Sequence, residues 1–195
     1  LEFMGLSEAI DKSVTHLKSI APKYFPYRNG VTGQAKAKSN FGLQGVGTLC
    51  LQLFGEANGF KPTDKLLDGM KSDGLKTLDW NNPPKDSMYA WYYQTFALFQ
   101  KGGTHWKAWN AKFQDMLKKN QNPEGYWKYP GKFHGPGTGK DDLDNHIHGT
   151  VFACLMLTVY YRYLPSTSKK SKEVKASKSD KSKAKSLGDE EIDIF

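Results

Sequence analysis

The fold is decided by residues 87–127, which read SMYAWYYQTFALFQKGGTHWKAWNAKFQDMLKKNQNPEGYW. The first run, Met88–Phe99, is apolar on nearly every face, which is typical of a helix enclosed by other helices. Two glycines end it. In the next run, residues 105–120, apolar side chains recur every three or four positions with lysines between them, which is typical of a helix with one face toward water. The stretch therefore predicts an αα-hairpin of an inner helix, a glycine turn and an outer helix.

The hairpin closes on three residues with the spacing Q-x-x-x-G-x-W: Gln121, Gly125 and Trp127. Glycine at the centre of such a turn indicates a backbone conformation that other residues resist. A tryptophan that follows the turn is large enough to pack between neighbouring helices. We therefore expect this turn to have a structural role.

The spacing resembles the QW motif of the squalene-cyclase and prenyltransferase α/α-toroid superfamily. Lys112 and Leu117 match the longer form of that motif, whereas Phe113 and Met116 stand where the family usually has a small and an aromatic residue. The phrases AWYYQTFALFQKGGTHWKAWN and TVYYRYLP are similar to those of bacterial proteins with squalene-cyclase-like repeats. The resemblance covers roughly residues 6–165 and implies an α/α toroid, a ring of αα-hairpins.

The same alternation of helix types runs through the rest of the chain, at a spacing of roughly fifty residues. We expect outer, amphipathic helices at 6–20, 62–78 and 105–120. We expect inner, more apolar helices at 41–54, 87–101 and 145–163. The sequence therefore predicts an all-α domain of about three αα-hairpins that form part of an α/α toroid.

The ends of the chain differ in composition from this repeat domain. Residues 1–5 are expected to be vector-derived or disordered. Residues 166–195 are rich in Lys and Ser with an acidic end, and are expected to be a disordered tail because they contain no set of hydrophobic residues able to offset chain entropy.

Residues 6–165 are expected to be a C-terminal part of a larger ring, since toroids of this superfamily usually have about six hairpins. An arc of three hairpins has two open ends. The candidate end surfaces are the stripe Ile10–Leu17 and the segment Tyr160–Tyr163. The remainder of a longer chain, or a second copy, would close the ring.

Charge and hydropathy restrict the classes of partner. The net charge is +8, of which the tail contributes +2, and +6 on the body is typical of an ordinary basic surface. No nucleic-acid-binding motif is present, so we expect no specific nucleic-acid partner. The longest apolar run, Val151–Tyr161, is too short to span a bilayer. No signal or transit segment is visible, and the native compartment is left open. Cys50 and Cys154 lie in apolar helical contexts and are expected to be buried thiols.

A catalytic acid is not where the resemblance would require it. Cyclases of this family protonate their substrate with an Asp in a D-x-D-D-T-A motif at the start of an inner helix. The nearest phrase here is DDLDNHIHGTVFA, and if Thr150 takes the place of the motif Thr, then His148 and Gly149 take the two acid positions. Three aspartates lie further upstream, in a predicted loop. The candidate catalytic residues are Asp141, Asp142, Asp144 and His148.

The same segment raises the question of a metal site. Asp and His are ligand types that suit zinc or a harder ion. Prenyltransferases of this superfamily bind zinc through Asp, Cys and His, but no Asp-x-Cys pair occurs here. His146 and His148, two residues apart, would point to different faces of a helix. A polar N-terminal cap at Asp144 or Asn145 explains the acidic residues better. We predict no metal and no cofactor, with His146 and His148 as weak metal candidates.

Aromatic residues of the inner helices are candidates for the lining of an isoprenoid cavity, because aromatic faces stabilise carbocations. They are Trp91, Tyr92, Phe96, Phe152 and Tyr160. Core packing uses the same residue types. The leading hypothesis is a non-catalytic binding or scaffold module for an isoprenoid or protein ligand. The alternative is an isoprenoid-handling enzyme, a terpene cyclase or prenyltransferase relative.

Overall fold

The chain is all-α, as predicted. The computed structural model describes residues 6–21, 23–26, 41–131 and 142–161, and no strand occurs among them. The expectations for residues 1–5 and 166–195, and candidate residue Asp141, lie outside the described residues. The helical elements are α1 (Leu6–Ile20), α3 (Phe41–Leu53), α4 (Lys61–Gly69), the π-helical turn η1 (Met70–Gly74), α5 (Ser87–Lys101), α6 (Gly103–Asn120), α7 (Asp142–Leu157) and the 3₁₀ turn η2 (Thr158–Tyr160).

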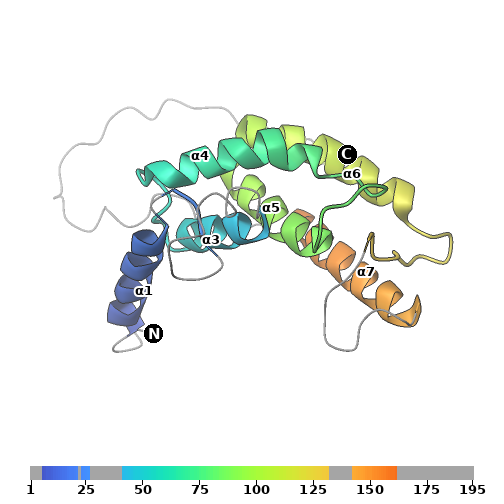
Figure 1. Cartoon of the computed structure of the whole chain (residues 1–195), viewed down its shortest axis with the longest axis horizontal. Helices are drawn as coiled ribbons and strands as arrows, with labels where there is room; N and C mark the ends of the chain where they lie inside the picture. Colours follow the sequence, from blue (N-terminus) through green and yellow to red (C-terminus); the bar gives the residue numbers. More distant parts are fainter. Residues whose placement is uncertain (1–5, 22, 27–40, 132–141, 162–195) are drawn as a thin grey trace, which may run out of the picture.

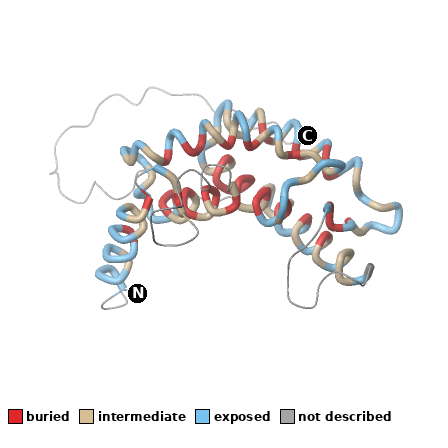
Figure 2. Tube along the Cα trace, viewed as in Figure 1, coloured by how far each residue is buried: buried red, intermediate tan, exposed pale blue. Residues whose placement is uncertain are grey.

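The helices from α3 onward form two rows that curve into an arc (Figure 1). The inner row is α3, α5 and α7, in which α5 packs against the other two. The outer row is α4 with η1, followed by α6. Buried residues concentrate where the two rows face each other (Figure 2). The predicted alternation of inner and outer helices is therefore present from α3 to α7.

Helix α1 differs from its expected place in the outer row. It lies at the end of the arc opposite α7 (Figure 1). Val14 is buried, and near the last turn the Nζ atom of Lys18 lies 2.7 Å from Oε2 of Glu56 and 5.7 Å from the ring centroid of Phe60. The stripe Ile10–Leu17, expected to be an open end surface, packs partly against the core. Two of the three expected outer helices thus form the outer row.

Close approach of α3 and α5 depends on one glycine. A Cβ atom at Gly45 would lie 2.8 Å from Cβ of Tyr93 and 3.0 Å from the backbone nitrogen of Gln94. Because any larger side chain would collide with the α5 backbone, Gly45 allows the two helices to pack directly. Along α5, Met88, Trp91, Ala97 and Leu98 are fully buried, as expected for an enclosed helix.

A second anchor ties the segment after α1 to α3. Nε2 of Gln44 donates to the carbonyl oxygen of Phe25 at 2.9 Å, and the backbone N–H of Phe25 donates to Oε1 of Gln44 at 2.8 Å. The ring of Phe25 lies against Gly47, where a Cβ would be 2.5 Å from it. The buried amide of Gln44 therefore binds its partner through both of its polar groups, as buried polar groups require.

The outer helix expected at 62–78 is interrupted by η1. A π turn inserts one extra residue per turn, which here brings Gly74 against α5. A Cβ atom at Gly74 would lie 2.4 Å from Oε1 of the fully buried Gln94. Just beyond the turn, the carbonyl oxygen of Thr77 accepts a hydrogen bond from Nε1 of Trp91 at 3.1 Å. The π turn and the residues just after it therefore bring the outer row into contact with the polar side-chain groups of Gln94 and Trp91 on the inner row.

Candidate functional site

The turn after α6 has the conformation expected from its spacing. Gly125 has a φ of +94°, a region that favours glycine. Its N–H donates to the carbonyl oxygen of Asn122 at 2.8 Å, and its own carbonyl accepts from Nε2 of Gln121 at 2.9 Å. The Gln and Gly of the motif therefore hold each other across the turn.

Trp127 joins the end of α6 to α7. Its side chain is 6% exposed, and Nε1 donates to the carbonyl oxygen of Leu117 at 2.9 Å. That carbonyl belongs to the last turn of α6, where carbonyl groups lack a partner within the helix. The backbone N–H of Trp127 donates to Oγ1 of Thr150 on α7 at 3.1 Å. The motif thus positions α7 relative to α6.

Gly149 fixes how closely α7 rests on this segment. A Cβ atom at Gly149 would lie 2.2 Å from the carbonyl oxygen of Trp127 and 2.7 Å from the backbone nitrogen of Tyr129. The same nitrogen donates to the carbonyl oxygen of Asn145 at 3.0 Å. Position 149, one of the two where the resemblance requires an acid, therefore has no room for any side chain.

The acidic and histidine candidates lie in the first turns of α7. The helix begins at Asp142, earlier than the expected residue 145, so Asp142 and Asp144 lie in the helix rather than in a loop. The expected cap at position 144 or 145 is wrong, because both residues are inside the first turn. Nδ1 of His148 lies 2.8 Å from the carbonyl oxygen of Asp144, and the ring of His146 stacks on Tyr126 with centroids 4.2 Å apart. No group of three His, Cys, Asp or Glu among the described residues is arranged to hold a metal ion.

Three of the five aromatic candidates come together in one cluster. The ring centroid of Tyr92 lies 5.0 Å from Phe96 and 6.3 Å from Phe152 on α7. Two more tyrosines extend the cluster, of which sequence reasoning missed Tyr89: the ring centroid of Tyr93 lies 4.9 Å from that of Tyr92 and 4.9 Å from that of Tyr89. Their spacing of four residues on one helix was the available signal. We call these five residues the Tyr92 cluster.

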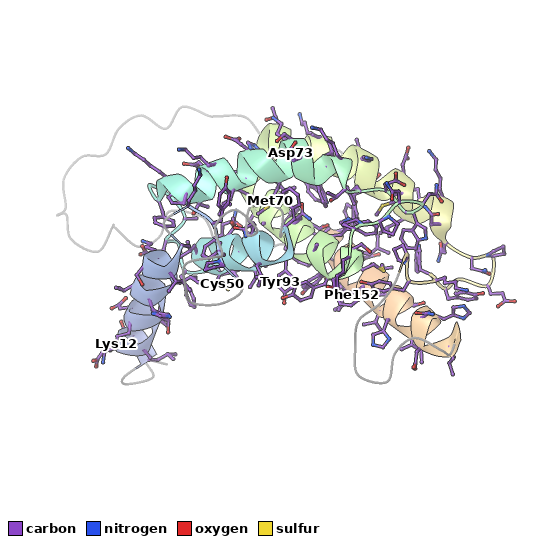
Figure 3. All side chains as sticks on the ribbon, viewed as in Figure 1. Lys12, Cys50, Met70, Asp73, Tyr93 and Phe152 are labelled. Atoms are coloured by element: carbon purple, nitrogen blue, oxygen red, sulfur yellow. The ribbon has the colours of Figure 1, made fainter. Side chains whose placement is uncertain are left out.

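The Tyr92 cluster lies on the inner side of the arc. Figure 3 shows Cys50 and Tyr93 on the side of the inner row that is away from Asp73 on the outer row. Burial raises the pKa of Tyr93, and the nearby phenols of Tyr89 and Tyr92 raise it further. The cluster is therefore a partly buried group of aromatic rings on α5 and α7 of the inner row.

The other two aromatic candidates lie apart from this cluster. Trp91 is fully buried, with its ring centroid 6.0 Å from that of Trp80. Tyr160 lies beside Trp106 of α6 with centroids 6.1 Å apart, and burial raises the pKa of its phenol. The structure thus distributes the five candidates over three places.

The outward face of α7 is an exposed aliphatic row, which sequence reasoning missed. We call it the α7 stripe: Leu143, Ile147, Val151 and Leu155, which are 67%, 50%, 49% and 37% exposed. On the other side of the helix, Ala153 and Met156 are fully buried. The apolar sequence of this segment predicted an inner helix enclosed by its neighbours. In the structure, none of the described helices covers this face of α7.

The cysteines also differ from expectation. Cys154 is exposed and lies in α7, next to the stripe, so the prediction that it is buried is wrong. Cys50 is half-buried, and burial raises the pKa of its thiol. Both thiols are free, and they lie on different helices, Cys50 on α3 and Cys154 on α7.

Comparison with known proteins finds no family model, no curated protein and no solved structure that matches this chain. The resemblance to squalene-cyclase-like repeats therefore depends on the motifs quoted above. Among the described helices, none combines the length and the apolar character needed to cross a lipid bilayer.

Proposed function

We propose that this chain is a non-catalytic binding or scaffold module of the squalene-cyclase-like and prenyltransferase-like toroid type, and that it binds another protein. The observation that carries the proposal is the α7 stripe. Four large aliphatic side chains, exposed in one line, form a contiguous apolar patch, and the largest such patch of a protein often binds a partner. The stripe spans about 18 Å, the length of three turns of a partner helix.

The geometry at Gly149 supports the absence of cyclase chemistry. A catalytic acid of this type must be held protonated in an enclosed site. Position 149 leaves no space for a side chain, and His148 at the preceding position bonds the carbonyl oxygen of Asp144. The remaining acids precede these positions by at least one helical turn.

The Tyr92 cluster favours the alternative, an isoprenoid-handling enzyme. Aromatic faces attract cations, and five rings on adjacent inner helices offer several such faces. A terpene cyclase or prenyltransferase would also need an acid or a metal site beside these rings.

Product analysis distinguishes the two candidates. The purified chain is incubated with squalene and with geranylgeranyl diphosphate, and the extracts are analysed by gas chromatography and mass spectrometry. We expect no cyclised or transferred product. A cyclic product that disappears in Asp142→Asn or Asp144→Asn, but not in the control Asp115→Asn on α6, would establish the enzyme instead.

Thiol labelling tests whether the α7 face is open. A polar maleimide should modify Cys154 in the Cys50→Ser variant faster than it modifies Cys50 in the Cys154→Ser variant. Cys154 is exposed, whereas burial disfavours the reactive thiolate of Cys50. Slow labelling of Cys154 in a folded, dilute chain would mean that this face is covered by the chain itself, which would contradict the proposal.

A further inference from the structure

The α7 stripe belongs to a helix that is anchored on one side only. Gly149 contacts the 127–129 segment, and Phe152 contacts the Tyr92 ring of α5. Ala153 and Met156 are fully buried on the same side. The opposite side presents a straight row with a spacing of four residues. Such a row is the ridge that fits between the ridges of another α-helix in the commonest class of helix packing.

Charge favours a helix over a lipid surface as the occupant. From Asn145 to Leu157 the sequence contains no Asp, Glu, Lys or Arg. The helix therefore offers no basic side chain to hold a lipid phosphate, the feature expected of an interfacial helix. Its two imidazoles already have contacts within the chain, since His146 stacks on Tyr126 and His148 bonds a carbonyl oxygen. Covering the stripe from Ile147 to Leu155 would bury apolar surface without burying a charge, whereas Asp142 and Asp144 flank Leu143 at its end.

The stripe is complementary to itself. Its four residues read Leu, Ile, Val, Leu, so the order of residue types is nearly the same in both directions. A two-fold axis beside the midpoint between Ile147 and Val151 would therefore pair β-branched residues at the centre and leucines toward both ends. A two-fold interface requires this property, because the same patch must serve on both subunits.

A further helix could be added to the inner row beside α7. In the chain, α3, α5 and α7 pack side by side, and α7 is the last of them. A second α7 would occupy the position that the next inner helix takes elsewhere in the row. In an antiparallel pair the helix dipoles of the two copies are also oppositely directed.

We propose that the partner of the α7 stripe is a second copy of this chain, bound through antiparallel α7 helices about a two-fold axis near Ile147 and Val151. This inference rests on the proposed function, because it names the protein that the module binds. The exposed fractions of the stripe amount to about two whole aliphatic side chains per copy, and an interface of this size belongs to the weak class.

Sedimentation equilibrium of the full chain tests the proposal at concentrations from about 1 to 300 μM, the range in which weak interfaces are populated. We expect a reversible monomer–dimer equilibrium. Val151→Lys should raise the dimer dissociation constant by at least about tenfold, because an ammonium group would have to lose its hydration in the interface. Leu53→Lys is the matched control, since Leu53 on α3 is 48% exposed, close to the 49% of Val151. It should associate like the wild-type chain.

A charge pair tests the two-fold arrangement itself. Val151→Lys and Ile147→Glu should each be monomeric, and an equimolar mixture should associate, because position 151 of one copy faces position 147 of the other and the two opposite charges then meet near the axis. Circular dichroism verifies that each variant is folded, and the reciprocal pair Ile147→Lys and Val151→Glu is used if either variant does not fold.

Three results would overturn the second-copy proposal: a wild-type chain that stays monomeric, a dimer that survives Val151→Lys, or equal effects of the lysine at positions 53 and 151. A monomer whose Cys154 is labelled rapidly at every concentration would refute self-association and leave the proposed function standing, with a different protein as occupant. A monomer whose Cys154 is labelled slowly would refute both.

Discussion

Replacement of Gly149 by alanine should destabilise the protein, although alanine is the better helix former. The added Cβ would lie 2.2 Å from the carbonyl oxygen of Trp127, 2.7 Å from the nitrogen of Tyr129 and 2.9 Å from the carbonyl carbon of Lys128. All three are backbone atoms, so no side-chain rotation relieves the collision. Helix α7 must move away from the 127–129 segment, which weakens the hydrogen bond from Tyr129 to the carbonyl of Asn145.

The magnitude follows from two opposing effects. Overpacking costs about 1–3 kcal/mol, and a collision with backbone belongs at the upper end. Alanine gains about 1 kcal/mol over glycine in a helix interior. The free energy of unfolding should therefore fall by about 2 kcal/mol, which lowers Tm by about 4–8 °C for a domain of this size.

Gly69 is the matched control. It has a helical φ of −62°, and a Cβ there would meet nothing within 4 Å. Gly69→Ala should therefore raise the free energy of unfolding by about 0.5–1 kcal/mol. Thermal unfolding followed by circular dichroism measures both variants. If Gly149→Ala melts at or above the wild-type temperature, the contact between α7 and the 127–129 segment is not as close as described.

Two further predictions concern stability. Trp127→Ala should lower the free energy of unfolding, measured by urea titration, by about 3–5 kcal/mol. Trp80→Ala removes a ring that is only half-buried, so it should lower this free energy by less. Equal losses in the two variants would mean that Trp127 has no special role in joining α6 to α7. Burial raises the pKa of Tyr129 and of Tyr160, so the folded state keeps these phenolic protons to higher pH than the unfolded state. The resulting stabilisation is fully present below the ordinary tyrosine pKa of about 10 and is lost as the pH rises above that value. When the free energy of unfolding is measured from about pH 9 to 11, it should decline less steeply in the double variant Tyr129→Phe, Tyr160→Phe than in the wild-type chain.

The local features of the fold could be predicted because each depends on a short stretch of sequence. The inner helix expected at 87–101 is α5, and the turn at Gly125 has the left-handed φ that glycine favours. In each case the physical signal, a hydrophobic period or a glycine in a turn, extends over fewer than about twenty residues.

Some site features could not be predicted because they depend on residues far apart in the chain. Trp91 and Tyr92 are adjacent in sequence, yet one packs beside Trp80 and the other beside Phe152. Adjacent helical residues point about 100° apart, so the face that each joins is set by where the neighbouring helices lie. The contact of Phe152 with the Tyr92 cluster therefore became visible only when α7 was placed against α5.

The sequence by itself determined that the chain is helical, that enclosed and one-faced helices alternate from α3 to α6, and that a turn closes the hairpin at Gln121, Gly125 and Trp127. Only the tertiary structure decided that α1 lies at the end of the arc and that α7 leaves the α7 stripe exposed. The physical reason is that hydrophobic pattern records how much apolar surface a helix carries, not how many neighbours cover it. For α7 the described chain supplies neighbours on one side, and the uncovered side is the surface that we propose binds a partner.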